Sequence, residues 1–461
     1  MRGALLTVIV FTLLIFIIRQ PYIGVLTWAW LGYMNPHRLA WTTAIPYSLL
    51  VAIVTLLALM VSKEPKRIPW TRESILLLVL IAWMFMTTVF SLYPWLAWEQ
   101  WDKVWRIMLM TYVTMMLINN EQRIKLLVFV IALSLGFYGF KGGWFTIATG
   151  GVHSVMGPAG SFIGDRNSIG LALIMTVPLL YFIKLQMTQW YFRWALLAGI
   201  GLTLVAIVGT QSRGAAVGIA LMLFFYLLKS RQKFSAVLAL VPLVLVLYYV
   251  MPEQYFERVE TIQTWEEDGS ASERVRAWQN AIHLANHRFI GGGMRALVFY
   301  GGETGGGRDS HSIYFGILGE HGWVGLGMFL LLIGFTWQSG SWIIRRAKRH
   351  KDLYWARDLA SMVQVSLVGY MAAGAFLGLQ YFDLFYHLVA IIVVTKVLVA
   401  QKIAEKGDIG DAESLSTGRG FVQGEPLSGT PGGTGLSRSP LLDAEKPGPG
   451  EAQVRSFVRG E

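Results

Sequence analysis

The sequence predicts an all-α, polytopic integral membrane protein. Of its 461 residues, 54% are hydrophobic and only 15% are charged. The mean hydropathy is +0.50, and apolar segments of about 18 or more residues recur along the chain, which is the length that crosses a bilayer as a helix. A soluble chain of this length would carry far more charge on its surface.

The remaining totals exclude several classes of protein. The net charge is +11, and in a membrane protein a basic excess indicates cytoplasmic loops before it indicates nucleic-acid binding, so we expect no nucleic-acid partner. The chain has no cysteine, which excludes disulfides, thiol catalysis and cysteine-ligated metals. The first apolar run, Ala4 to Ile18, is not followed by a small-residue cleavage site, so it is expected to be a retained membrane helix.

The apolar segments predict about twelve crossings and one large periplasmic helical loop. Segment 4–34 is counted as one crossing with 22–34 kinked or interfacial, because Pro21 should break the helix. A thirteenth crossing follows if 22–34 spans separately. The other expected spans are 45–62, 75–92, 104–118, 124–142, 168–185, 194–209, 214–229, 234–251, 312–336, 359–378 and 384–400.

Four basic segments orient these spans. They fall on one side of the arrangement, which the positive-inside rule makes the cytoplasm, together with both termini. They are SKEPKR (62–67), NNEQRIK (119–125), KSRQK (229–233) and RRAKRHK (345–351). The opposite, periplasmic side then receives 93–103, 143–167, the turn at 209–214, 252–311 and 379–383.

We therefore expect two parts. Residues 1–401 form the transmembrane helical domain, which includes the periplasmic loop 252–311, and residues 402–461, rich in Gly, Pro, Ser and mixed charge, form a disordered cytoplasmic tail. Within the loop, apolar residues at helical spacing predict a helix over 270–287. The glycine-rich stretches after it, at 291–293 and 301–307, are expected to be flexible.

Helical spacing separates two arginines of this outer helix. Arg274 and Arg276 are two positions apart, hence about 200° apart around the axis, and cannot share a face. Arg274 aligns with Trp278, so it is expected to face the bundle, while Arg276 aligns with His283 and faces outward.

The topology brings four charged or titratable side chains to one level of the outer face: Arg166, Arg213, Arg274 and His311. Taken singly, each has an ordinary reading: arginines near helix ends snorkel to lipid phosphates, and a His at a helix start often only bonds interfacial groups. Together, the arginines exceed the acids near them, which favours an anionic ligand. Guanidinium forks match phosphate oxygens, and a His titrates near neutral pH, so we expect a lipid-linked diphosphate with His311 as general base.

Other polar residues near this level are candidates for a supporting role. Asp165 beside Arg166 has a simple reading as its ion-pair partner. Glu320 also has a structural reading, since it lies next to a helix break expected near Gly319 and Gly322. The residues expected to support the side chains of the site are Asp309, Glu320 and His387.

The sequence resembles the O-antigen ligase / O-antigen polymerase superfamily of bacterial envelope enzymes. The matching segments, in the family's order and spacing, are GDRNSIGLAL (164–173), TQSRGAAVG (210–218), SERVRAWQNAI…HRFIGGG (272–293) and DSHSIYFGILGEHGWVG (309–325). The opening PYIGVLTWAWLGYMNPHRL (21–39) is similar to a subgroup found beside exosortase systems and described as O-glycosylation ligases.

The resemblance implies an O-antigen ligase, a glycosyltransferase of lipopolysaccharide biosynthesis in the bacterial inner membrane. It would move a glycan from undecaprenyl diphosphate to a sugar hydroxyl of lipid A–core at the periplasmic face. Carried over by motif, Arg213 is the arginine of the S-R-G element, Arg274 is the loop arginine four before a Trp, and His311 is the essential His. The family commonly has Asn after this His, whereas this chain has Ser312.

The same resemblance, read with the residues, implies catalysis without a metal or another cofactor. Arg213, Arg166 and Arg274 would stabilise the leaving diphosphate where a metal ion might otherwise serve, and direct displacement would invert the anomeric carbon. The alternatives are an O-antigen polymerase or a protein O-oligosaccharyltransferase of the same superfamily. A lipid-linked glycan transporter is disfavoured, because its ionisable residues should lie near the midplane.

Overall fold

The computed structural model describes residues 2–40, 45–229, 269–300 and 310–418. Every regular element in these ranges is a helix, which confirms the all-α class. The helices are α1 (Arg2–Arg19), α2 (Tyr22–Met34), α3 (Pro36–Leu39), α4 (Tyr47–Val61), α5 (Arg72–Val89), α6 (Pro94–Leu117), α7 (Glu121–Ala148), α8 (Arg166–Gln186), α9 (Trp190–Gly209), α10 (Arg213–Lys229), α13 (Gly269–His287), η1 (Ala296–Val298), α14 (Ile313–Ala347), η3 (Lys351–Leu353), α15 (Tyr354–Gly374) and α16 (Asp383–Gly418).

Within the described residues, seven helices are long and apolar enough to cross a membrane: α1, α5, α7, α8, α9, α14 and α16 as far as Glu405. α4 is apolar but shorter. Each expected span in the described ranges overlaps a helix, whereas 234–251 lies outside them. The chain is therefore a multi-pass helical membrane protein.

Three helix boundaries differ from the expected ones. α6 begins at Pro94, so residues 94–103 are helical and not an outer loop; a proline in the first turn is compatible with a helix because it lacks only an unneeded N–H. α14 runs on to Ala347, into the basic segment 345–351. α16 continues to Gly418, past the domain boundary expected at 402, while residues 419–461 of the expected tail lie outside the described ones.

The segment 4–34 forms two antiparallel helices, so its treatment as one net crossing is wrong. The chain breaks at Pro21, as predicted, and reverses there. Thr7 of α1 bonds Tyr47, at the start of α4, with 2.7 Å between the hydroxyl oxygens. Tyr22, which begins α2, lies instead under Arg123 of α7, with the guanidinium 4.2 Å from the ring centroid. α1 therefore begins at the end of the bundle opposite Arg123.

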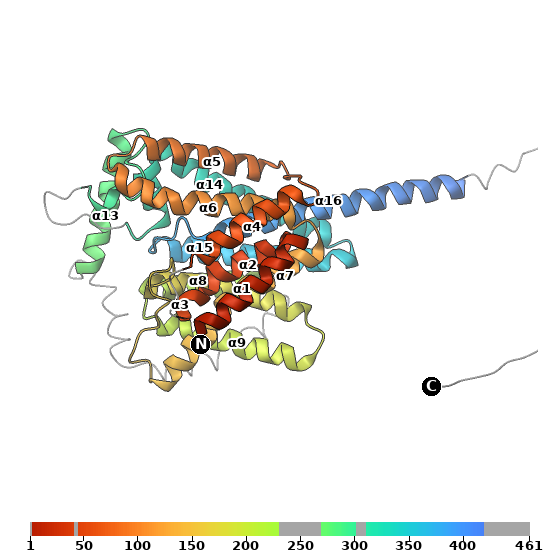
Figure 1. Ribbon diagram of the computed structural model, residues 1–461, viewed down its shortest axis with the longest axis horizontal. Helices are drawn as coiled ribbons and strands as arrows, with labels where there is room; N and C mark the ends of the chain where they lie inside the picture. Colours follow the sequence, from red (N-terminus) through yellow and green to blue (C-terminus); the bar gives the residue numbers. More distant parts are fainter. Residues whose placement is uncertain (1, 41–44, 230–268, 301–309, 419–461) are drawn as a thin grey trace, which may run out of the picture. The chain divides into compact units, whose positions relative to one another are not determined.

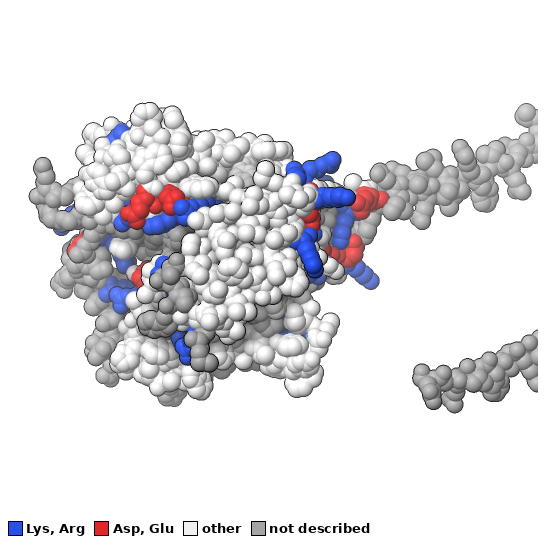
Figure 2. Space-filling model, viewed as in Figure 1, with Lys and Arg blue, Asp and Glu red and all other residues white. Residues whose placement is uncertain are grey.

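The basic segments of the described part gather at one end of the bundle. Arg123 of α7 pairs with Glu64 of the 62–67 loop at 2.6 Å. Lys402 of α16 pairs with Glu121 at the start of α7 at 3.2 Å. Figure 2 shows charged side chains at this end and a broad uncharged surface beside it. Since α1 begins at the other end, the expected placement of the N-terminus with these loops is wrong.

The expected periplasmic segments meet at the opposite end, where α13 lies across the ends of several helices (Figure 1). The N–H of Leu92, in the α5–α6 turn, donates to Gly292 O at 2.9 Å, and the N–H of Val155 donates to Gly209 O at 2.9 Å. These bonds join segments that are far apart in the sequence. We call this end of the bundle the outer end.

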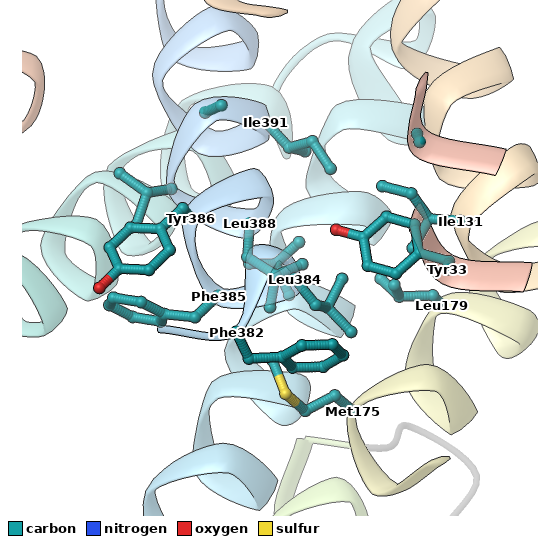
Figure 3. Packing of buried hydrophobic residues seen from close by; sticks show 14 of the residues in the cluster. Tyr33, Ile131, Met175, Leu179, Phe382, Leu384, Phe385, Tyr386, Leu388 and Ile391 are labelled. Atoms are coloured by element: carbon teal, nitrogen blue, oxygen red, sulfur yellow. The ribbon is translucent and has the colours of Figure 1, made fainter. Parts of the chain in front are cut away.

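The core surrounds the first turns of α16. Leu384, Phe385, Leu388 and Ile391 are fully buried there. Figure 3 shows them beside Tyr33 of α2 and residues of α7 and α8. Dense packing of this kind fixes the loop that enters α16, residues 375–382, against the rest of the outer end.

Candidate functional site

His311 lies two positions before the first residue of α14, at the outer end. Its φ of 46° lies in the left-handed region, which is rare for a residue with a side chain and is held only by its surroundings. The next residue, Ser312, is the extended N-cap of α14. The side chain of His311 lines a cavity of about 330 Å³.

Trp278 of α13 fixes the chain just before His311. Its indole Nε1 donates to the carbonyl oxygen of Ser310 at 2.9 Å. The indole also stacks on Phe315, with ring centroids 4.9 Å apart and an interplanar angle of 15°. The conformation of His311 is therefore set from both sides, by α13 and by α14.

The helix over 270–287 forms as predicted, and its inward face is the predicted one. Ala281 and Ala285, which align with Trp278, are buried, while Arg276, His283 and His287 are exposed. Arg274 is half-buried, one turn before Trp278 on the same face.

Arg213 begins α10 after a tight turn in which Gln211 has a φ of 52°. The Gln211 amide donates to Gly151 O at 2.8 Å and so ties this turn to the 149–165 loop. Gly214 lies against Phe376 and Leu377, where an added Cβ would approach Phe376 to 3.0 Å. Leu377 also lines the cavity of His311. The start of α10 is therefore a neighbour of the cavity.

α13 also contacts the 375–382 loop, through Trp278. Trp278 lies 6.2 Å from Phe376 between ring centroids. The structure thus brings the elements that carry Arg213, Arg274 and His311 together around residues 376 and 377. Neither arginine is among the residues that line the cavity itself.

Arg166 is exposed at the first position of α8. Residues next to it in the sequence, and not Arg166 itself, line the cavity of His311. Asp165 is the N-cap of α8 and accepts from the N–H of Asn167 at 2.8 Å and of Ser168 at 3.1 Å. It is thus a helix cap and not, as one reading had it, the ion-pair partner of Arg166. Asp165, Asn167 and Ser168 line the cavity, whereas Arg166 does not.

Most of the residues that line the cavity are polar, with amide, carboxyl, hydroxyl, imidazole and guanidinium groups. Such groups hydrogen-bond sugar hydroxyls. The polar lining residues are Gln100, Asp165, Asn167, Ser168, Arg295, His311, Glu320, Gln380 and Tyr381.

Glu320, expected in a supporting role, lies in the wall of this cavity and is buried. Its Oε1 accepts the N–H of Arg295 at 2.8 Å, and its Oε2 accepts the hydroxyl of Tyr381. The same hydroxyl lies 2.6 Å from Nε2 of His321, whose Nδ1 lies 2.6 Å from the Thr87 hydroxyl. A continuous hydrogen-bonded chain therefore runs from the cavity wall to α5.

Arg295 is a cation of the cavity that was not among the site residues expected from the sequence. Its φ of 59° is left-handed, and the bond from its N–H to Glu320 holds it in this conformation. Its guanidinium lies 3.7 Å from Glu99 of α6. Lys103, and after it Arg295, holds the pKa of Glu99 below its usual range. A signal was present in the sequence, because Arg295 lies only two positions after the glycine turn 291–293.

That glycine segment is an ordered part of the site. α14 has a break at Gly322, whose φ of 69° and ψ of −173° are non-helical, as expected for this position. The break deprives carbonyl groups before it of their helical partners. Gly319 O and Glu320 O instead accept from the N–H groups of Gly292 and Gly293, both at 2.9 Å. Residues 291–293 are thus not the flexible loop that we expected.

One of the expected supporting residues, His387, does not reach the cavity. His387 is buried on α16, where its Nδ1 lies 2.8 Å from the Tyr33 hydroxyl of α2. It does not line the cavity of His311. Asp309 lies outside the described residues, as does the expected flexible stretch 301–307.

These features define a multi-pass helical membrane protein with a polar cavity at one end of its bundle. Residues 198–330, which carry Arg213, Arg274, His311 and Glu320, match the family described as O-Antigen ligase. This match identifies residues 198–330 as a domain of the O-antigen ligase superfamily, whose members are glycosyltransferase-like enzymes. Residues 1–188 match a second family, described as a family of unknown function (DUF5935). No curated protein matches the chain.

Proposed function

We propose that the protein is an O-antigen ligase, a glycosyltransferase that moves a glycan from undecaprenyl diphosphate to a sugar hydroxyl of lipid A–core. The reaction takes place at the periplasmic face of the inner membrane. The observation that carries this proposal is the position of His311, held in a left-handed conformation at the wall of a polar cavity. The family match supports the class of reaction, and the cavity lining suits a sugar.

In the proposed reaction a ring nitrogen of His311 accepts the proton of the acceptor hydroxyl. The hydroxyl oxygen forms a bond to the anomeric carbon, and the bond from that carbon to the diphosphate oxygen breaks. Undecaprenyl diphosphate leaves with the electron pair. Arg213, Arg274 and Arg166 stabilise its growing negative charge, so we expect neither a metal nor another cofactor. Displacement in one step inverts the anomeric carbon.

The identity of the acceptor distinguishes an O-antigen ligase from the other enzymes of its superfamily. An O-antigen polymerase would use a second lipid-linked glycan, and a protein O-oligosaccharyltransferase would use a Ser or Thr hydroxyl. A transporter for lipid-linked glycans is less well supported, because Arg213, Arg274 and His311 lie on elements that meet at the outer end and not at mid-bundle.

The test is glycan transfer by purified protein with the lipid-linked donor, with and without lipid A–core. We expect transfer that requires lipid A–core and is lost in His311→Ala, because the variant lacks the ring nitrogen that accepts the proton in the proposed reaction. His283→Ala is the matched control, since His283 is exposed on the outward face of α13 and should transfer normally. Near-wild-type turnover by His311→Ala would exclude His311 as the base. Transfer without lipid A–core would identify a polymerase.

A further inference from the structure

A second cavity, of about 390 Å³, adjoins the first at the outer end. Both are lined by Phe162, and the loop that supplies Tyr381 to the first supplies Phe382 and Asp383 to the second. The second cavity lies between α2, α4 and α6, within the segment 1–188 for the most part. We call it the α2–α4–α6 groove.

One part of the groove is apolar. Its walls include Leu31 of α2, Ala52, Ile53 and Leu56 of α4, and Ile107 of α6. The side chain of Ile53 is 46% exposed, so this wall continues into an apolar surface of α4 that lies among membrane-crossing helices. A long hydrocarbon chain in the bilayer can enter such a groove from the side.

The other part of the groove is basic, lined by Arg38, Lys103 and Arg106. Lys103 and Arg106 pair with Glu99 and Asp102, one turn earlier on α6. Arg38 has no carboxylate partner among the described residues. The groove therefore offers at least one cation that no carboxylate of the described residues contacts.

Unpartnered nitrogen atoms also gather here. The buried side-chain atoms without a hydrogen-bond partner in the described part of the chain include Nε of Arg38, Nε of Arg106 and Nδ1 of His37. All three residues line the groove. Buried donors of this kind usually have an acceptor, and phosphate oxygens are strong acceptors for guanidinium N–H groups.

The position of Arg38 is built into the fold. Its Nη1 donates to Ala159 O at 2.8 Å. Gly160, with a φ of 73°, lets the guanidinium approach closely, because a Cβ there would lie 2.4 Å from Nη1. The 149–165 loop thus holds Arg38 between the groove and the residues before α8.

We infer that the α2–α4–α6 groove binds the lipid part of the donor. Its single polyisoprenoid chain lies in the apolar part and the phosphate bonded to that chain lies at Arg38, while the phosphate bonded to the glycan is the one that Arg213, Arg274 and Arg166 stabilise. The reacting anomeric carbon is bonded to the diphosphate, so the chain of the donor begins close to the reacting atoms. A groove that adjoins the cavity of His311 meets this requirement, whereas an acceptor glycan can place its lipid far from its reacting hydroxyl. This inference rests on the proposed function only in taking the donor to be a lipid diphosphate.

The test measures binding of undecaprenyl phosphate to the purified full-length protein in detergent by native mass spectrometry. We expect Arg38→Gln to weaken binding about tenfold through loss of a charge-assisted hydrogen bond. Ala52→Trp should weaken it about as much by filling the apolar part. Two variants of exposed α9 residues, Arg193→Gln and Ala195→Trp, are matched controls and should bind as the wild type does. Unchanged melting temperatures would show that the groove variants fold.

Wild-type binding by both groove variants would overturn the inference. So would weaker binding of lipid A with unchanged binding of undecaprenyl phosphate, since the groove would then hold an acceptor. These outcomes are separate from the proposed function. If the groove variants lose undecaprenyl phosphate but the wild type transfers glycan without lipid A–core, the proposed function fails and the inference stands. If transfer requires His311 but both groove variants bind normally, the inference alone fails.

Discussion

At the scale of single residues, the backbone of His311 is the most informative feature of the outer end. A left-handed conformation costs a residue with a side chain about 1–3 kcal/mol and persists only where the surroundings impose it. Trp278, through Ser310 O, and the N-cap Ser312 impose it here. The sequence could predict that His311 begins a helix, but not its φ, because the restraint comes from a Trp that lies 33 positions earlier in the chain.

Arg213→Lys should slow glycan transfer about 10- to 100-fold. The lysine keeps the charge but loses the guanidinium fork, and one charge-assisted hydrogen bond is worth about 1.5–3 kcal/mol. Arg213→Ala should be slower still. The measurement is turnover at saturating acceptor, and Arg193→Lys on α9 is the control. Neither variant should respond to added divalent metal, and a chelator should leave the wild-type rate unchanged. If Arg213→Lys turned over at the wild-type rate, Arg213 would serve only to anchor the helix end to lipid phosphates and would not bind the diphosphate of the donor.

At the scale of elements, the sequence predicted most helices but not the contacts between them that build the cavity. The break in α14 could be foreseen from Gly319 and Gly322. Its consequence could not, because the partners of the freed carbonyl groups, Gly292 and Gly293, come from a segment that reads as a flexible linker. For the same reason Arg295 was missed, since only the bond to Glu320 places it in the cavity wall.

The ion pair between Glu64 and Arg123 joins the α4–α5 loop to α7 and should make stability depend on acid. Both guanidinium nitrogens Nη1 and Nη2 contact the carboxylate, at 2.9 and 2.6 Å. The hydrogen bond from Arg123 lowers the pKa of Glu64. The contribution is therefore complete above the unfolded-state pKa of about 4.3 and is lost as the pH falls through the lowered folded-state pKa.

We accordingly expect Glu64→Gln to destabilise the protein by about 1–2 kcal/mol at pH 7, with a difference from the wild type that shrinks below about pH 4. Thermal unfolding in detergent at several pH values measures this difference. Asp358→Asn is a suitable control, because among the described residues Asp358 pairs only with its neighbour Arg357 on the same helix. A difference between Glu64→Gln and the wild type that stayed constant from pH 7 to pH 3 would contradict the assignment.

At the scale of the whole molecule, charge patterning predicted which loops share an end, and the apolar segments predicted most of the helices. Loops 62–67 and 119–125 meet as expected. The error lies in 4–34, where hydropathy alone does not distinguish a kinked helix from a hairpin. α2 has 13 residues, too few to be recognised from the sequence as a separate span. It nevertheless begins beside Arg123 of α7 and leads to α3, whose Arg38 contacts the 149–165 loop at the outer end.

The reversal at Pro21 makes a prediction about sidedness, which the absence of cysteine makes easy to test. Single cysteines at Ala4, Lys63 and Val152 would mark the start of α1, the basic loop and the outer loop. Because basic loops stay in the cytoplasm, a membrane-impermeant maleimide should label Val152→Cys in intact spheroplasts and Lys63→Cys only after permeabilisation. Ala4→Cys should behave like Val152→Cys, since Thr7 contacts Tyr47 at the outer end. Labelling of Ala4→Cys only after permeabilisation would mean that α1 does not pair with α2 as the structure has it. The same delay at Val152→Cys would put the cavity of His311 in the cytoplasm, where it could not meet a periplasmic acceptor.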